Sequence, residues 1–175
     1  MAGTLSVVSL GAVNRALLEL AAASAAQQFD VVTIIDPPLA EPHYAFNPSR
    51  KQHNASAVVR KLGQAHLKPG RDAILALGHI DLFEPEADFV LADGDRDFRA
   101  AVIGLARLRD GRDDERFMRR VQLMAIWAAG QAIGQRSCDD VRCVMNLAER
   151  ADDLDRRSGN LCAPCKQLAI KQGQG

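Results

Sequence analysis

Four cysteines near the end of the chain have the spacing of a metal site. Cys138 and Cys143 are separated by four residues, and Cys162 and Cys165 are separated by two. The 18 residues from 144 to 161 lie between the two pairs. Two closely spaced pairs at this distance are typical of zinc bound tetrahedrally by four thiolates. Because four protein ligands leave no open coordination position, we expect the zinc ion to be structural and not catalytic.

Other uses of these cysteines stay open from the sequence alone. Free thiols, two disulfides in an oxidising compartment, or an iron–sulfur cluster would use the same four residues. A zinc ion has a physical advantage, since it ties two chain segments together and contributes an apparent ~10–16 kcal/mol in small zinc-binding peptides. We therefore predict one structural zinc ion, within a tetracysteine zinc subdomain over residues 138–167.

The segment just before the cysteines has the spacing, but not the side chains, of a catalytic zinc site. It reads WAAGQAIGQRSCDDVRCVM from position 127 to position 145. Positions 127 and 131 share one face of a helix. Gly134 can end that helix and bend the chain, so that position 137 returns toward the same point. In the metzincin pattern H-E-x-x-H-x-x-G-x-x-H, three of these positions are histidine ligands and position 128 is a glutamate base.

The whole pattern resembles the archaemetzincin family of metzincin zinc metalloproteases. In that family the histidine motif continues directly into a cysteine, then C-x4-C-x-M, a longer spacer and C-x-x-C. This chain keeps the following residues in register: Gly134, Cys138, Cys143, Met145, Cys162 and Cys165. The spacer from Met145 to Cys162 has 16 residues, one fewer than the family pattern.

Upstream segments resemble the same family and extend the resemblance to about Phe46–Lys166. They are Phe46-Asn47-Pro48 with Arg50, Gln52, Asn54 and Ala55; Asp81-Leu82-Phe83 with Pro85 and Phe89-Val90; and Ala101-Val102-Ile103 with Arg107-Leu108. The resemblance implies a metzincin-like α/β fold, with a mixed twisted sheet, packed helices and a small zinc-bound C-terminal subdomain. It also implies an edge strand that lines a cleft and pairs with an extended peptide, which we place around Phe89 to Asp93.

All four positions that carry the family's chemistry are changed. Trp127, Gln131 and Ser137 stand in place of the three histidines, and Ala128 stands in place of the glutamate base. An amide and an unactivated hydroxyl are poor zinc ligands compared with imidazole. Without a metal nothing lowers the pKa of a bound water, and alanine cannot accept its proton. The substitutions predict a catalytically inactive pseudo-protease, in which Met145 of the family's Met-turn is a packing residue.

Two other interpretations remain. In the first, the chain is a zinc-dependent metallopeptidase with a rebuilt, non-standard metal site. Such a site would use His43 and His53, which flank the long loop, or the carboxylates Asp36, Asp81 and Glu84; the other two histidines are His66 and His79. No two of these histidines share a short ligand spacing, so they are more simply surface or loop residues. In the second, the chain is a purely structural or assembly subunit, in which Trp127 and its neighbours have closed the cleft.

The elements that position these motifs indicate an α/β fold. Apolar and β-branched runs predict strands at residues 4–10, 31–36, 73–77, 89–92 and 101–106, with a polar turn at 93–97. Helical spacing predicts helices at residues 12–28, 55–65, 115–134 and, more briefly, around 147–157, before a loop-rich tail. Residues 38–54 are predicted to form a long loop. This order suggests a single domain over residues 1–175, with helices against a mixed sheet of about five strands.

The composition excludes some partners. Lys plus Arg and Asp plus Glu both number 22, so a formal charge of zero gives no electrostatic reason to expect nucleic acid. No apolar run is long enough to span a membrane. Arg15 and Glu19 interrupt the apolar N-terminal stretch, which has no basic residue before it, and this argues against a signal peptide. We expect a cytoplasmic protein with reduced thiols, whose partner is a peptide or another protein.

Overall fold

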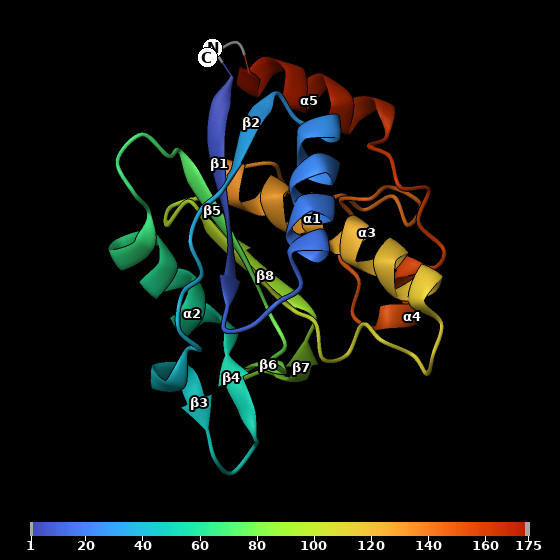
Figure 1. Ribbon diagram of the computed structural model, residues 1–175. Coiled ribbons are helices and arrows are strands. Elements are labelled where there is room, and N and C mark those ends of the chain that lie inside the picture. Colours follow the sequence, from blue (N-terminus) through green and yellow to red (C-terminus); the bar gives the residue numbers. More distant parts are fainter. Residues whose placement is uncertain (1, 174–175) are drawn as a thin grey trace.

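The computed structural model of the protein describes residues 2–173. Its main feature is a twisted five-stranded sheet with the order β2-β1-β5-β9-β8 (Figure 1). Four strands are parallel, and the edge strand β8 is antiparallel to β9. The strands are β1 (Gly3–Leu10), β2 (Val31–Ile35), β5 (Ala73–Gly78), β8 (Ala92–Asp95) and β9 (Ala100–Gly104). The sheet confirms the predicted mixed α/β class.

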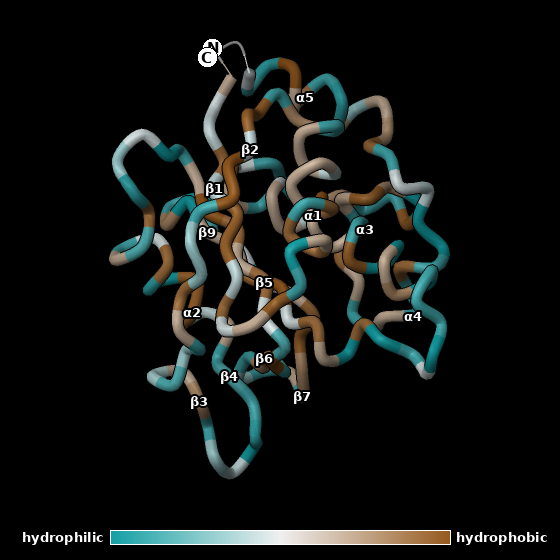
Figure 2. Tube along the Cα trace, viewed as in Figure 1, coloured by the Kyte–Doolittle hydropathy of each residue, from teal (hydrophilic) through white to brown (hydrophobic). Residues whose placement is uncertain are grey.

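Helices cover both faces of this sheet, and alternate strand residues therefore face two separate cores. Leu75 and Leu77 belong to the larger core, and Ile74 and Ala76 to the smaller one. The larger core includes residues of α1 (Arg15–Gln28) and α3 (Asp114–Ile133); the smaller includes residues of α2 (Ala55–Lys61) and the π-helical turn η2 (Leu62–His66) that continues it. Because both faces are covered, the central strands β5 and β9 consist only of apolar residues and glycine, and brown segments run through the middle of the sheet in Figure 2.

A second, four-stranded sheet adjoins the first, and the sequence did not predict it. Its order is β3-β4-β6-β7. It takes up part of the predicted loop 38–54, which also contains the short 3-10 helix η1 (His43–Ala45). Its strands are β3 (Phe46–Asn47), β4 (Gln52–Asn54), β6 (Leu82–Glu84) and β7 (Ala87–Val90). These strands are too short to produce a clear alternation of apolar and polar residues.

The edge of the large sheet differs from the prediction. The predicted strand at 89–92 is divided between two sheets, because Phe89 and Val90 lie in β7 of the small sheet and Ala92 begins β8 of the large one. The polar turn predicted at 93–97 begins only after Asp95, because residues 93–95 belong to β8. Asp and Gly rarely favour strands, and tertiary contacts override that preference. A Cβ atom at Gly94 would lie 2.6 Å from the Cβ of Gln131, so only glycine lets β8 approach α3 this closely.

The C-terminal third begins with α3 and ends with a helix. Asp113 caps the start of α3, and Gly134 ends it with a φ of +96°, as predicted for a bend at this glycine. The short helix expected around 147–157 is limited to α4 (Ala151–Leu154). The tail, predicted to be rich in loops, forms α5 (Ala163–Gly173), which runs beside the first residues of β1 and β2 (Figure 1). In the described chain no helix has the length and apolarity to cross a bilayer.

Candidate metal centre

The four thiols converge on one point. Their sulfur atoms all lie within 4.8 Å of one another, and the Sγ atoms of Cys138 and Cys162 are 3.8 Å apart. Tetrahedral Zn–S bonds of about 2.3 Å place ligand sulfurs about 3.8 Å from each other. All four are free cysteines; Cys143 and Cys165 are buried and the other two are half-buried. The donor set and its spacing fit a zinc ion with four protein ligands.

Backbone groups surround these sulfurs with hydrogen-bond donors. The amide of Asp140 donates to Cys138 Sγ at 3.4 Å, and that of Met145 donates to Cys143 Sγ at 3.5 Å. The amide of Cys162 also donates to Cys143 Sγ, at 3.4 Å. Burial raises the pKa of the Cys143 thiol, whereas a backbone N–H at the start of α5 lowers the pKa of Cys162. Since zinc ligands must be deprotonated, metal binding here would release protons.

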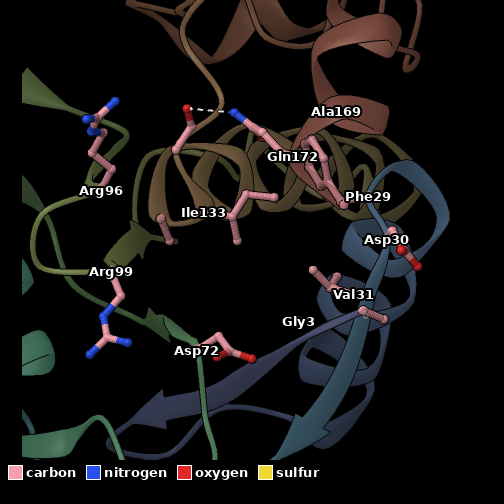
Figure 3. Close-up of a pocket in the computed structure, with 14 residues that line it drawn as sticks. Gly3, Phe29, Asp30, Val31, Asp72, Arg96, Arg99, Ile133, Ala169 and Gln172 are labelled. Atoms are coloured by element: carbon pink, nitrogen blue, oxygen red, sulfur yellow. Dashed lines mark hydrogen bonds between the residues drawn. The ribbon is translucent and has the colours of Figure 1, made fainter. Parts of the chain in front are cut away.

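The cysteines also hold α5 against the rest of the protein. Cys165 is the only fully buried residue of this helix. The carbonyl of Cys165 accepts a hydrogen bond from Gln135 Nε2 at 3.3 Å, and Gln172 Nε2 donates to the carbonyl of Gly134 at 3.1 Å (Figure 3). Apart from these contacts and the partly buried Ala169, the side chains of α5 are mostly exposed, so Cys165 is the main buried anchor of this helix.

The residues at the four ligand and base positions of the metzincin motif, 127, 128, 131 and 137, fall into two groups. Trp127 and Ala128 are buried in the larger core, with 6% and 0% of their surface exposed. The indole Nε1 of Trp127 has no hydrogen-bond partner within the described residues. Gln131 and Ser137 lie at the surface side of the bend, where Gln131 Nε2 donates to Ser137 Oγ at 3.1 Å. The structure thus brings two of the four positions into contact and leaves none with a strong metal ligand.

Met145, at the family's Met-turn position, packs directly beneath α3. It is fully buried, and a Cβ atom at Gly130 would lie 2.7 Å from the Met145 Cε. The amide of Cys138 donates to the carbonyl of Met145 at 2.9 Å. The methionine therefore connects the cysteine loop to the helix that carries the degenerate motif.

The histidines proposed for a rebuilt site do not come together with other ligands. Within residues 2–173, the four cysteines are the only group of three or more His, Cys, Asp or Glu side chains close enough to share an ion. His53 is buried, and its ring centroid lies 5.0 Å from that of Phe46. Burial lowers the pKa of His53, which favours the neutral ring. His66 is in η2 and His79 is an exposed residue after β5.

The carboxylates considered for that site have structural partners. Asp36 is buried and accepts two hydrogen bonds from the guanidinium of Arg71, at 2.9 and 3.0 Å. Asp81 accepts a similar pair from Arg107, at 2.6 and 2.8 Å. Glu84 accepts from the amide of Ser56 in the first turn of α2, at 2.7 Å. Each carboxylate therefore stabilises the fold in a way that needs no metal.

The sequence does not single out two side chains that the structure places in unusual surroundings. Burial, reinforced by the charge of Glu84, raises the pKa of Asp93 in β8 to about 6. Arg157 lies between the cysteine pairs with only 7% of its surface exposed. Its sequence context, DLDRRSGN, has the composition of an exposed loop. Only the folded chain distinguishes Arg157 from its exposed neighbour Arg156.

Three surface cavities have volumes of about 650, 550 and 390 Å³. The largest lies between α5, the end of α3 and the first residues of β1 and β2. Figure 3 shows Arg96 and Arg99 on one side of it, with Ile133 and Val31 between them and Asp30. None of the three is lined by residues 127, 128, 131 or 137.

Comparison with known proteins identifies the family. The pattern of peptidase family M54 matches residues 38–171. The archaemetzincin of Methanopyrus kandleri is 32% identical over 127 residues, covering 73% of this chain and 71% of that protein. The archaemetzincin of Methanocaldococcus jannaschii is 25% identical over 169 residues, covering 94% and 91%.

Solved structures show the same fold. The crystal structure of archaemetzincin from Methanopyrus kandleri matches with a TM-score of 0.86 at 24% identity, covering 99% of this chain and 97% of that one. A zinc-dependent peptidase from Methanocorpusculum labreanum matches with a TM-score of 0.76 at 22% identity, covering 94% and 99%. The predicted archaemetzincin resemblance is confirmed, and the chain belongs to peptidase family M54.

Proposed function

We propose that this chain is a catalytically silent member of the family. In this proposal one structural zinc ion is held by Cys138, Cys143, Cys162 and Cys165, and no metal binds at the degenerate motif. The observation that carries the proposal is the contact between Gln131 and Ser137. Two side chains at former ligand positions bind each other, through groups that compete poorly with imidazole for zinc. Trp127 and Ala128 offer neither a ligand nor a proton acceptor.

A silent member of a peptidase family keeps a scaffold that was shaped around peptides. Strand β8 is the last strand of its sheet, and its outer edge can pair with an extended chain. We propose that this edge, over Ala92–Asp95, binds a peptide or protein segment. The proposed edge begins three residues and ends two residues further along than in the sequence analysis, because Phe89 belongs to the small sheet. The neutral charge and reduced thiols suit a cytoplasmic partner that is neither nucleic acid nor membrane.

Metal stoichiometry tests the zinc part of the proposal. Elemental mass spectrometry of the purified chain should give one zinc per chain, and a C162S/C165S variant should give none. Two metals in the wild type, with one remaining in the variant, would show a second site and favour a rebuilt metallopeptidase.

Activity and binding assays test the remaining parts. The zinc-loaded chain should leave unstructured protein substrates and mixed-sequence peptides intact; cleavage that a chelator abolishes would overturn the proposal of silence. Titration of isotopically labelled protein with end-blocked pentapeptides of mixed sequence should shift the amide resonances of Ala92–Asp95. Shifts elsewhere, or none, would count against peptide binding at β8.

A structural or assembly role is the second candidate. It is favoured by the burial of Trp127 and by the absence of the four degenerate positions from the walls of the three described cavities. This role would be supported over peptide recognition by two results. The chain would form a stable complex with another protein or a second copy that added peptides do not affect, and the β8 edge would bind no peptide.

A further inference from the structure

The loop that carries the first cysteine pair is organised by one buried arginine. Arg157 Nη1 donates to the carbonyl of Val141 at 2.7 Å. Its Nη2 donates to Asn146 Oδ1 at 2.7 Å and to the carbonyl of Leu147 at 3.3 Å. These acceptors lie on both sides of Cys143 in the sequence, so a single guanidinium fixes the path of the loop before and after a proposed ligand.

Asn146 extends this network to the other cysteine of the pair. Its Nδ2 donates to the carbonyl of Cys138 at 2.7 Å. The loop is also joined to the segment that leads into the second pair, since the amide of Ser158 donates to the carbonyl of Arg142 at 3.0 Å. Arg157 therefore lies where the two halves of the cysteine cluster meet.

The conformation fixed in this way supplies the hydrogen bonds to sulfur. The amides of Asp140 and Met145, which donate to Cys138 and Cys143, both belong to the segment held by Arg157 and Asn146. Hydrogen bonds from outside the coordination sphere orient metal ligands and spread their charge. A displaced loop would lose these donors even with all four cysteines present.

Charge provides a separate argument. The three acceptors of Arg157 within the described chain are neutral oxygens, and its Nε has no partner there. A buried cation without a counter-charge is unfavourable. A zinc ion with four thiolates carries a net charge of −2, and one of those thiolates, Cys143, lies in the loop that Arg157 holds.

We propose that Arg157, acting through Asn146 and the backbone of residues 141–147, is a positioning residue for the tetracysteine zinc centre. This inference rests on the zinc site of the proposed function. It assigns to Arg157 a role in retaining the metal, beyond holding a loop in shape.

The test measures the rate at which zinc passes from the intact chain to a chromogenic chelator. In R157Q and N146A, zinc release should be at least about tenfold faster than in the wild type, the usual lower limit for loss of such supporting groups. R157K keeps the charge but not the forked hydrogen bonds, so its rate of zinc release should lie between the rates of the wild type and of R157Q. R156Q removes the exposed neighbouring arginine and should release zinc at the wild-type rate.

A second measurement separates this role from loop stability alone. R157Q should lower the melting temperature of the zinc-loaded chain clearly more than that of the C162S/C165S variant, because the arginine acts through the metal. Equal losses in both backgrounds would show a purely structural residue and overturn the inference. Unchanged zinc release in R157Q and N146A would overturn it too. A wild type without zinc would instead refute the proposed zinc site itself.

Discussion

The side-chain Nε2 of Gln131 donates a hydrogen bond to the hydroxyl of Ser137 across 3.1 Å, although the two residues are six positions apart and α3 ends between them. The left-handed Gly134 makes this contact possible, because it turns the chain back toward the helix. The turn therefore brings position 137 back to position 131, as the spacing of the metzincin motif requires.

Restoring the ligands should restore a metal site. A variant with Trp127→His, Gln131→His and Ser137→His should bind a second zinc per chain, because three imidazoles would point toward the bend. Elemental mass spectrometry checks the count, with Gln131→His alone as the control that should stay at one. A count of one in the triple variant, with the fold intact by circular dichroism, would show that the scaffold no longer supports the site.

Zinc removal should release α5 before it unfolds the sheet. Cys165 is the only buried residue of this helix, which otherwise contacts the protein mainly through the Gln172–Gly134 hydrogen bond and the partly buried Ala169. Each kcal/mol of stability lost on chelation would lower the melting temperature by about 2–4 °C in a chain of this size. Hydrogen exchange after chelation should show lost protection at α5 and residues 138–147, with β1 and β5 still protected. An equal loss of protection in α5 and in β1 and β5 would contradict the prediction that α5 is released first.

Asp36 should stabilise the fold at neutral pH and not in strong acid. The Arg71 guanidinium beside Asp36 lowers the pKa of this carboxyl from 3.8 to about 2. The stabilisation is therefore complete above pH 3.8 and is lost as the pH falls through about 2. We expect Asp36→Asn to cost about 2 kcal/mol at pH 7 in urea unfolding. Asp97→Asn, at a carboxylate with 86% of its side chain exposed, is the control and should cost little.

Asp93 should have the opposite effect. Burial raises its folded-state pKa from 3.8 to about 6, so the folded chain holds this proton more tightly than the unfolded chain does. The charged Asp93 therefore destabilises the folded chain. This destabilisation is absent below pH 3.8, grows as the pH rises, and is complete above pH 6. Asp93→Asn should therefore stabilise the protein by about 1–2 kcal/mol at pH 7, less than the full shift implies because the group keeps some solvent contact. Equal effects at pH 3.5 and pH 7 would refute this assignment.

The sequence predicted those features that depend on local spacing. The cysteine pairs, the bend at Gly134 and the long helix before it follow from short-range patterns, and the structure has the pairs together and the bend in place. The predicted helix over 115–134 differs from α3 by one residue at each end.

What the sequence did not predict depends on contacts between distant segments. Strand β8 contains Asp93 and Gly94, which disfavour strands in isolation and are held there by β9 and α3. The small sheet consists of strands with no clear alternation. Arg157 has the same sequence signature as Arg156, and only its neighbours in space bury it.

The burial of Trp127 has a practical consequence. It is the only tryptophan of the chain, it stands where the metzincin pattern has its first histidine, and 6% of its surface is exposed. The intrinsic fluorescence of the protein therefore reports on this one point without any added dye. A peptide, a metal ion or a partner that binds beside Trp127 or reshapes its surroundings would change the emission of a reporter that the protein already carries.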